Sequence, residues 1–156
     1  MKKYNLKVSI MGFPKLYREF EVTENCTFDD LHEAIFEAFD RYDEHLYSFF
    51  ITRKDTKNTR SIYSSPEITH PMNLEDMGYG KKKLSTSRTL IGDAGLQEKD
   101  VFHYLFDFGD DWWHRVLVVK VDEVKDKKKI IKLVKSVGES PPQYPDYDDE
   151  YDEEYE

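Results

Sequence analysis

The residues best suited to chemistry lie between two runs of strand-forming residues in the C-terminal third of the chain. Residues 107–114 read Asp-Phe-Gly-Asp-Asp-Trp-Trp-His, so three carboxylates, two indoles and an imidazole share eight positions. Carboxylates beside an imidazole can bind a divalent metal or act as acid and base. Alternatively, aspartate caps the turn through Asx-type hydrogen bonds and the tryptophans pack. In either case we expect Gly109 to supply the positive φ of the turn.

Two earlier histidines, His32 and His45, are candidate partners of this segment. If the C-terminal hairpin folds beside the strand after His45, both imidazoles converge with His114 and a carboxylate, Asp107 or Asp110. Three imidazoles and a carboxylate would suit a transition metal. The alternative is that each histidine is a hydrogen-bonded structural residue.

Sequence motifs assign no reaction to the chain. One cysteine and five histidines show neither HxxxH nor HExxH spacing, which argues against a standard zinc site. We find no Gly-x-Ser-x-Gly motif, no P-loop and no dinucleotide fingerprint. No cofactor is therefore assigned, and a divalent metal at His32, His45, Asp107, Asp110 and His114 is the only one considered.

The elements that must position these residues follow from hydropathy. Residues 4–10 and 16–22 alternate between apolar and polar and predict a hairpin. Thr27 and Asp30 form a capping box, and apolar residues at helical spacing predict a helix over 28–39. The apolar run 46–51 predicts a buried strand.

The rest of the chain alternates between patternless and strand-like segments. Residues 53–88 lack periodicity and are expected to form a long loop, with one helical turn at 73–77. Residues 89–96 predict a turn-rich connection. Strands are expected at 101–107, 113–121 and 130–134, the first two forming a hairpin.

Together these elements predict one α+β domain over residues 1–140. Hairpin, capped helix, strand and a ubiquitin-like connection follow the order of a β-grasp fold. We therefore expect a mixed sheet with one main helix across one face, extended by the C-terminal hairpin. Residues 141–156 are expected to be an acidic disordered tail.

Composition limits the classes of partner. The formal net charge is −9, but eight acids and no Lys or Arg lie in 144–156, so the first 143 residues are close to neutral. A strongly basic body, the usual sign of nucleic-acid binding, is absent. The single cysteine favours a reducing cytoplasm, and no apolar run suits a bilayer span or a signal peptide.

Three segments give the chain a family resemblance. They are residues 12–18 (Gly-Phe-Pro-Lys-Leu-Tyr-Arg), 31–39 with 45–49, and most specifically 104–114, Tyr-Leu-Phe-Asp-Phe-Gly-Asp-Asp-Trp-Trp-His. In combination and order they resemble the plasmid pRiA4b ORF-3-like family, whose domain is also called MM3350-like. The family's Trp-Arg-Arg is reduced here to Tyr17-Arg18-Glu19, and its C-terminal acid pair and glycines are missing after Pro142.

The resemblance implies an intracellular domain of uncharacterised function from a family associated with plasmids or mobile elements. Some relatives are labelled transposon resolvases, yet this chain lacks the nucleophilic serine with clustered arginines that a serine resolvase needs. Our leading hypothesis is a non-enzymatic binding or adaptor domain for a protein or small ligand. Its candidate binding residues are Arg18, His32, His45, Asp107, Gly109, Asp110, Asp111, Trp112 and His114. The alternatives are a metal-dependent hydrolase using the His/Asp cluster and an accessory protein in DNA transactions.

Overall fold

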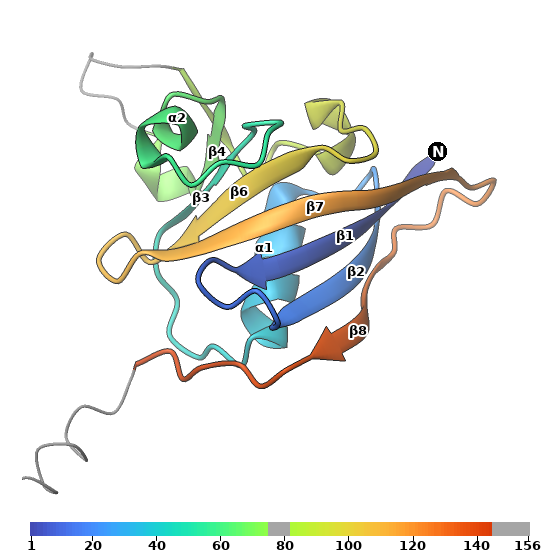
Figure 1. The fold of residues 1–156 in the computed structure, drawn as a ribbon. Coiled ribbons are helices and arrows are strands. Elements are labelled where there is room, and N and C mark those ends of the chain that lie inside the picture. Colours follow the sequence, from blue (N-terminus) through green and yellow to red (C-terminus); the bar gives the residue numbers. More distant parts are fainter. Residues whose placement is uncertain (75–81, 145–156) are drawn as a thin grey trace, which may run out of the picture.

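The computed structural model describes residues 1–74 and 82–144, in which eight strands form one sheet. The strands are β1 (Lys2–Ile10), β2 (Tyr17–Thr23), β3 (Tyr47–Phe50), β4 (Glu67–Thr69), β5 (Lys83–Ser85), β6 (Val101–Phe106), β7 (Trp112–Glu123) and β8 (Ile131–Val137). Their order across the sheet is β5-β4-β3-β6-β7-β1-β2-β8 (Figure 1). Every neighbouring pair is antiparallel except β4 and β5.

The helix α1 (Phe28–Ala38) lies across one face of this sheet (Figure 1). Its predicted capping box is present: the Thr27 hydroxyl accepts from the Asp30 backbone N–H at 3.0 Å, and the Asp30 carboxylate accepts from the Thr27 N–H at 2.9 Å. The apolar stripe of α1 packs with alternate residues of β1, β3, β6 and β7 in one core cluster. The alternation, the apolar runs and the cap are local features, which is why the sequence predicted these elements correctly.

The hairpin of β6 and β7 occupies the middle of the sheet. It was expected to extend an N-terminal sheet, but β6 pairs with β3 while β7 pairs with β1, so the hairpin joins the two halves. The α+β architecture with one main helix is thus confirmed in a larger sheet. The β-grasp assignment stays a prediction.

The segment 53–88 contains more structure than the expected loop. It includes α2 (Thr59–Tyr63), β4, the 3-10 helix η1 (Pro71–Asn73) and β5. Three-residue strands are too short to show a period of two. In β4, moreover, buried polar residues replace an apolar stripe, since the Ser48 hydroxyl bonds the Glu67 carboxylate at 2.7 Å and the Thr69 hydroxyl at 2.6 Å.

Two further predictions fall partly on residues that the structure does not describe. The helical turn expected at 73–77 overlaps the undescribed residues 75–81, and most of the expected tail lies in 145–156. The part of the tail that is described belongs to the domain, because Gln143 is only 2% exposed. Within residues 1–74 and 82–144, no helix is long and apolar enough to cross a bilayer.

Candidate ligand-binding cleft at the 107–114 turn

The turn between β6 and β7 is held by the side chain of Asp107. Its Oδ1 accepts from the backbone N–H of Gly109 at 3.0 Å and of Asp110 at 3.3 Å. The Asx-type capping expected as one of two alternatives is therefore present. The positive φ angles belong to Asp107 (64°) and Asp111 (54°), so assigning that role to Gly109 was wrong. Aspartate tolerates this region because its short carboxylate can hydrogen-bond the local backbone.

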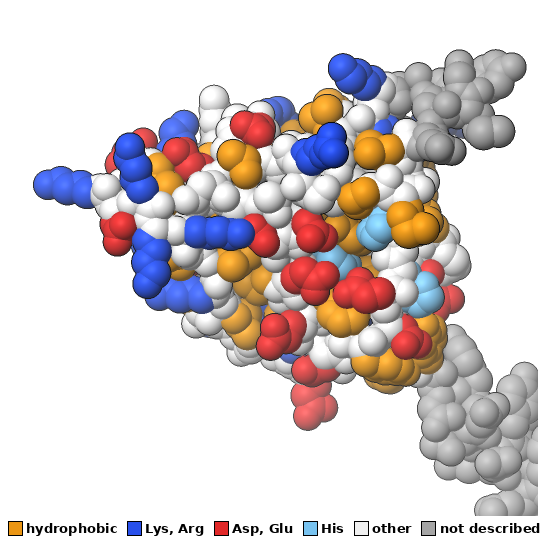
Figure 2. All heavy atoms as spheres, turned by 180° about the vertical axis from the view of Figure 1, so that it is seen from behind, with side chains coloured by type: hydrophobic (Ala, Val, Ile, Leu, Met, Phe, Trp, Pro, Cys, Tyr) orange, Lys and Arg blue, Asp and Glu red, His pale blue; other side chains and the backbone are white. Residues whose placement is uncertain are grey.

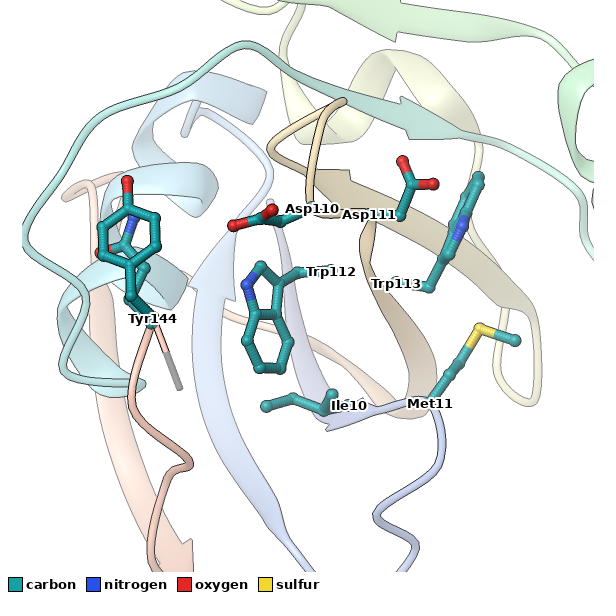
Figure 3. A pocket seen from close by; sticks show the side chains of 8 residues that line it. Ile10, Met11, Asp110, Asp111, Trp112, Trp113 and Tyr144 are labelled. Carbon is teal, nitrogen blue, oxygen red and sulfur yellow. The ribbon is translucent and has the colours of Figure 1, made fainter. Parts of the chain in front are cut away.

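Beside this turn lies a cavity of about 610 Å³, in the usual size range of ligand pockets. In Figure 3, Trp112 lies above Ile10. Met11 and Trp113 lie to one side of this pair, and Tyr144 faces them across the opening. The carboxylates of Asp110 and Asp111 stand on the rim. The lining residues are Ile10, Met11, Asp110, Asp111, Trp112, Trp113, Gln143 and Tyr144, and none of them carries a positive charge.

Strand register explains why these residues meet. β1 ends where β7 begins, with Ile10 opposite His114 and the Met11 N–H donating to the Trp113 carbonyl at 2.9 Å. Consecutive residues of β7 point to opposite faces. Trp112 accordingly packs against the main core on the α1 side, whereas Trp113 packs against a smaller cluster that contains Phe50. The two indoles thus lie on opposite faces of the sheet at its end.

The Tyr144 wall is fixed by side chains distant in sequence. The His45 Nε2 lies 2.7 Å from the Tyr144 hydroxyl and 3.4 Å from the Asp107 Oδ2. Gln143 accepts from the backbone N–H of Tyr42 at 2.9 Å and donates to the Asp43 carbonyl at 2.8 Å. The connection between α1 and β3 therefore ties the C-terminal segment to the turn.

A buried arginine, Arg41, lies behind the cleft. Its guanidinium is 5.0–5.4 Å from the ring centres of Phe39, Phe106 and Trp112, and only 7% of the residue is exposed. Burial lowers the pKa of Arg41 to about 10, so it remains charged at neutral pH. The Arg41 Nη2 donates a hydrogen bond to the His114 Nε2 at 2.9 Å. Its hydrogen-bond partner is thus an imidazole and not a carboxylate.

That bond determines the state of His114. Since a guanidinium can only donate, the His114 Nε2 must be the acceptor, and Nδ1–H donates to the Tyr104 carbonyl at 3.2 Å. Burial and the nearby Arg41 charge lower the pKa of His114 well below its ordinary value. A neutral imidazole with both nitrogens engaged has no lone pair for a metal.

His32 and Arg18 lie away from the cleft. His32 is 1% exposed and stacks on Tyr47 at a ring separation of 3.6 Å, with Nδ1 2.6 Å from the Tyr104 hydroxyl. Arg18 donates to the carbonyls of Ala38 and Val137, each at 3.0 Å. Arg18 therefore caps the C-terminal end of α1, where a cation also complements the helix dipole.

The structure brings together only some of the predicted site residues. Asp107 and His45 are neighbours, and Asp110, Asp111 and Trp112 share the cleft. The five metal candidates do not gather at one point. Among the described residues the group spaced to hold a metal is instead His32 with Glu33 and Glu44.

Two buried donors near the cleft have no hydrogen-bond partner among the described atoms, namely the Trp112 Nε1 and the Arg41 Nη1. Figure 3 shows the Trp112 indole nitrogen turned toward the Tyr144 side of the opening. A buried donor without a partner costs about 1–3 kcal/mol. A ligand that supplied an acceptor at Trp112 would recover part of this free energy.

The sequence comparison decides the family. The plasmid pRiA4b ORF-3-like protein family matches residues 2–153. The chain belongs to this family. It is also similar to a crystal structure described as a protein of unknown function, MM3350 from Methanosarcina mazei Go1. Sequence identity is 26%, the TM-score is 0.67, and the match covers 91% of this chain and 72% of that chain. No curated protein matches.

In this pRiA4b ORF-3-like protein, the sequence identified the 107–114 turn but not the residues that complete the cleft. Ile10 and Met11 come from the end of β1, and Gln143 and Tyr144 from a segment assigned to the tail. Arg41 follows the C-terminal end of α1. None of these positions has a local signal, because each contacts the turn across about 30–100 residues of chain.

Proposed function

We propose that this pRiA4b ORF-3-like protein is a cytoplasmic binding domain that takes a basic segment of a partner protein into the cleft at the 107–114 turn. The observation that carries the proposal is the lining of the cleft. Aromatic walls and two rim carboxylates surround a cavity of about 610 Å³, and none of the described lining residues is a cation.

Charge favours a cationic side chain as the ligand group. Three carboxylates, those of Asp107, Asp110 and Asp111, lie in or beside the cleft, and among the described residues Arg41 is the cation packed against Trp112, so the local charge is negative. A cation placed over an indole or phenol ring gains about 0.5–2 kcal/mol, and a rim carboxylate adds about 0.2–1 kcal/mol.

The partnerless indole N–H favours a peptide over a free cation. The Trp112 Nε1 can donate to an acceptor, and a peptide offers main-chain carbonyls beside its basic side chain. Burial and the neighbouring Asp43 raise the pKa of Tyr144 to about 12, which keeps its hydroxyl protonated at neutral pH.

The same geometry gives less support to a hydrolase. The Nε2 of His114 accepts from Arg41, and the carboxylate of Asp107 caps the turn. These two groups are two of the five residues of the proposed metal cluster, and both are used in holding the structure. Binding therefore remains the function that the geometry supports best.

Tryptophan fluorescence provides a direct test, because the chain has two tryptophans and both line the cleft. The probes are N-acetyl-arginine amide and its nearly isosteric neutral analogue N-acetyl-citrulline amide. We expect a saturable fluorescence change with the arginine probe at a Kd on the order of 1 mM, and binding of the citrulline probe at least about fivefold weaker.

Matched variants locate the binding. Asp110→Asn and Asp111→Asn should each weaken the arginine probe by about two- to fivefold. Asp126→Asn, an identical change on an exposed residue of the β7–β8 loop, should leave binding unchanged. Equal affinity for both probes, or an equal effect of Asp126→Asn, would contradict the proposal.

A further inference from the structure

A second group of potential ligands lies outside the cleft, on α1 and the connection that follows it. Figure 2 shows the molecule from behind, where several acidic side chains lie near histidines. His32 and Glu33 project from α1, and Glu44 comes from the connection between α1 and β3. The His32 Nε2 lies 3.0 Å from a Glu44 oxygen and 3.8 Å from a Glu33 oxygen. All three ligand atoms fall within 4.8 Å of one another.

The imidazole in this group is held as metal-binding histidines are usually held. His32 is 1% exposed, and its ring lies parallel to Tyr47, with an interplanar angle of 2°. The inner nitrogen, Nδ1, is fixed by the fully buried Tyr104 hydroxyl at 2.6 Å. A partner on the second ring nitrogen fixes the orientation of a ligating histidine. The nitrogen left facing the carboxylates is Nε2.

Among the described residues, the two glutamates have no positively charged side chain that neutralises them. In the ion pairs of residues 1–74 and 82–144, the partner of both is His32 alone. Each glutamate is more than half exposed, so an ion in solution can reach both carboxylates.

From this geometry we infer that His32, Glu33 and Glu44 bind a divalent first-row transition metal, such as Zn²⁺ or Mn²⁺, with water completing the coordination. A metal about 2.0–2.2 Å from each ligand needs ligand atoms about 3–4 Å apart. Both glutamate oxygens, at 3.0 Å for Glu44 and 3.8 Å for Glu33, already meet this spacing relative to the His32 Nε2. One imidazole nitrogen with carboxylate oxygens suits these metals better than Ca²⁺ or Mg²⁺, which prefer all-oxygen shells.

Metal binding requires the imidazole proton to reside on Nδ1, where the Tyr104 oxygen can accept it. The Nε2 lone pair then points between the two carboxylates. The site would join α1 to the α1–β3 connection, which also carries the backbone contacts to Gln143. None of the three ligands lines the cleft, so this inference is independent of the proposed function.

The test is isothermal titration of the metal-free full-length chain with Zn²⁺, repeated with Mn²⁺ and followed by electron paramagnetic resonance. We expect one site per chain, and Glu33→Gln and Glu44→Gln should each weaken it by at least tenfold. Glu37→Gln removes the same charge from an exposed position one turn along α1 and should have no effect. At a metal concentration 100 times the Kd, the Tm should rise by roughly 5–10 °C.

A second measurement reports on the histidine without risking the fold. In long-range ¹H–¹⁵N spectra of the imidazoles, Zn²⁺ should shift the His32 Nε2 resonance and leave that of the buried His103 unchanged. Binding that is equal in Glu33→Gln, Glu44→Gln and Glu37→Gln would indicate general attraction to acidic residues and would overturn the inference. An absence of binding at millimolar metal would do the same.

Discussion

Substitutions in the 107–114 turn should show that the turn depends on the conformation and side chain of Asp107, and not on those of Gly109. Asp107→Ala removes an acceptor of two backbone N–H groups, each worth about 1 kcal/mol net. It also leaves alanine at φ 64°, where a β-carbon without a compensating polar group costs about 1–2 kcal/mol. The expected loss of unfolding free energy is about 2–4 kcal/mol.

Gly109→Ala is the matched control in the same turn. Gly109 does not have a positive φ, and an added β-carbon would lie 3.4 Å from the Asp107 Oδ1, which is ordinary contact. The reduced entropy of the unfolded chain favours alanine by about 0.4–1 kcal/mol, which offsets any crowding. The unfolding free energy should therefore change by less than about 0.5 kcal/mol, a surface-like effect. Asp107→Asn, which keeps the acceptor oxygen, should fall between the two.

Urea unfolding followed by far-ultraviolet circular dichroism measures these differences, with an unchanged m value showing that the unfolded states are comparable. For a chain of this length Asp107→Ala should lower the Tm by roughly 5–15 °C. The reasoning is refuted if Gly109→Ala destabilises the protein as much as Asp107→Ala. That outcome would restore the positive φ to the glycine, as the sequence had suggested.

Three further substitutions test the surrounding structure. Burial lowers the pKa of His114, so below about pH 6.5 the unfolded chain takes up a proton that the folded chain does not. The unfolding free energy should therefore decrease by about 1.4 kcal/mol for each unit by which the pH is lowered. His114→Gln should remove this part of the pH dependence in urea titrations between pH 7 and pH 5. Arg18→Met leaves the Ala38 carbonyl at the end of α1 without its donor and should lower the unfolding free energy by about 2–4 kcal/mol; a change below about 1 kcal/mol would show that the cap is dispensable. Gly138→Ala should cost about 1–3 kcal/mol in chemical denaturation, because φ is 84° and the new β-carbon would lie 3.2 Å from Leu16; a neutral result would contradict this geometry.

The sequence by itself determined the elements whose signals are local. Alternation placed β1, β2 and β7, a run of strand-forming residues placed β6, and the pair Thr27 and Asp30 placed the start of α1, because each pattern depends on neighbours a few residues away. The crowded turn at 107–114 was also identified, as was the family.

Only the tertiary structure decided how those elements meet. β6 and β7 join the halves of the sheet because both of their edges find partners distant in sequence, and no local pattern encodes that choice. Likewise His114 is neutral because the fold buries it beside Arg41, which contacts it across 73 residues, and the cleft closes because Tyr144 bonds His45 across 99. A local pattern specifies which face of an element is buried, whereas the partners of a buried polar group follow from the packing of the whole chain.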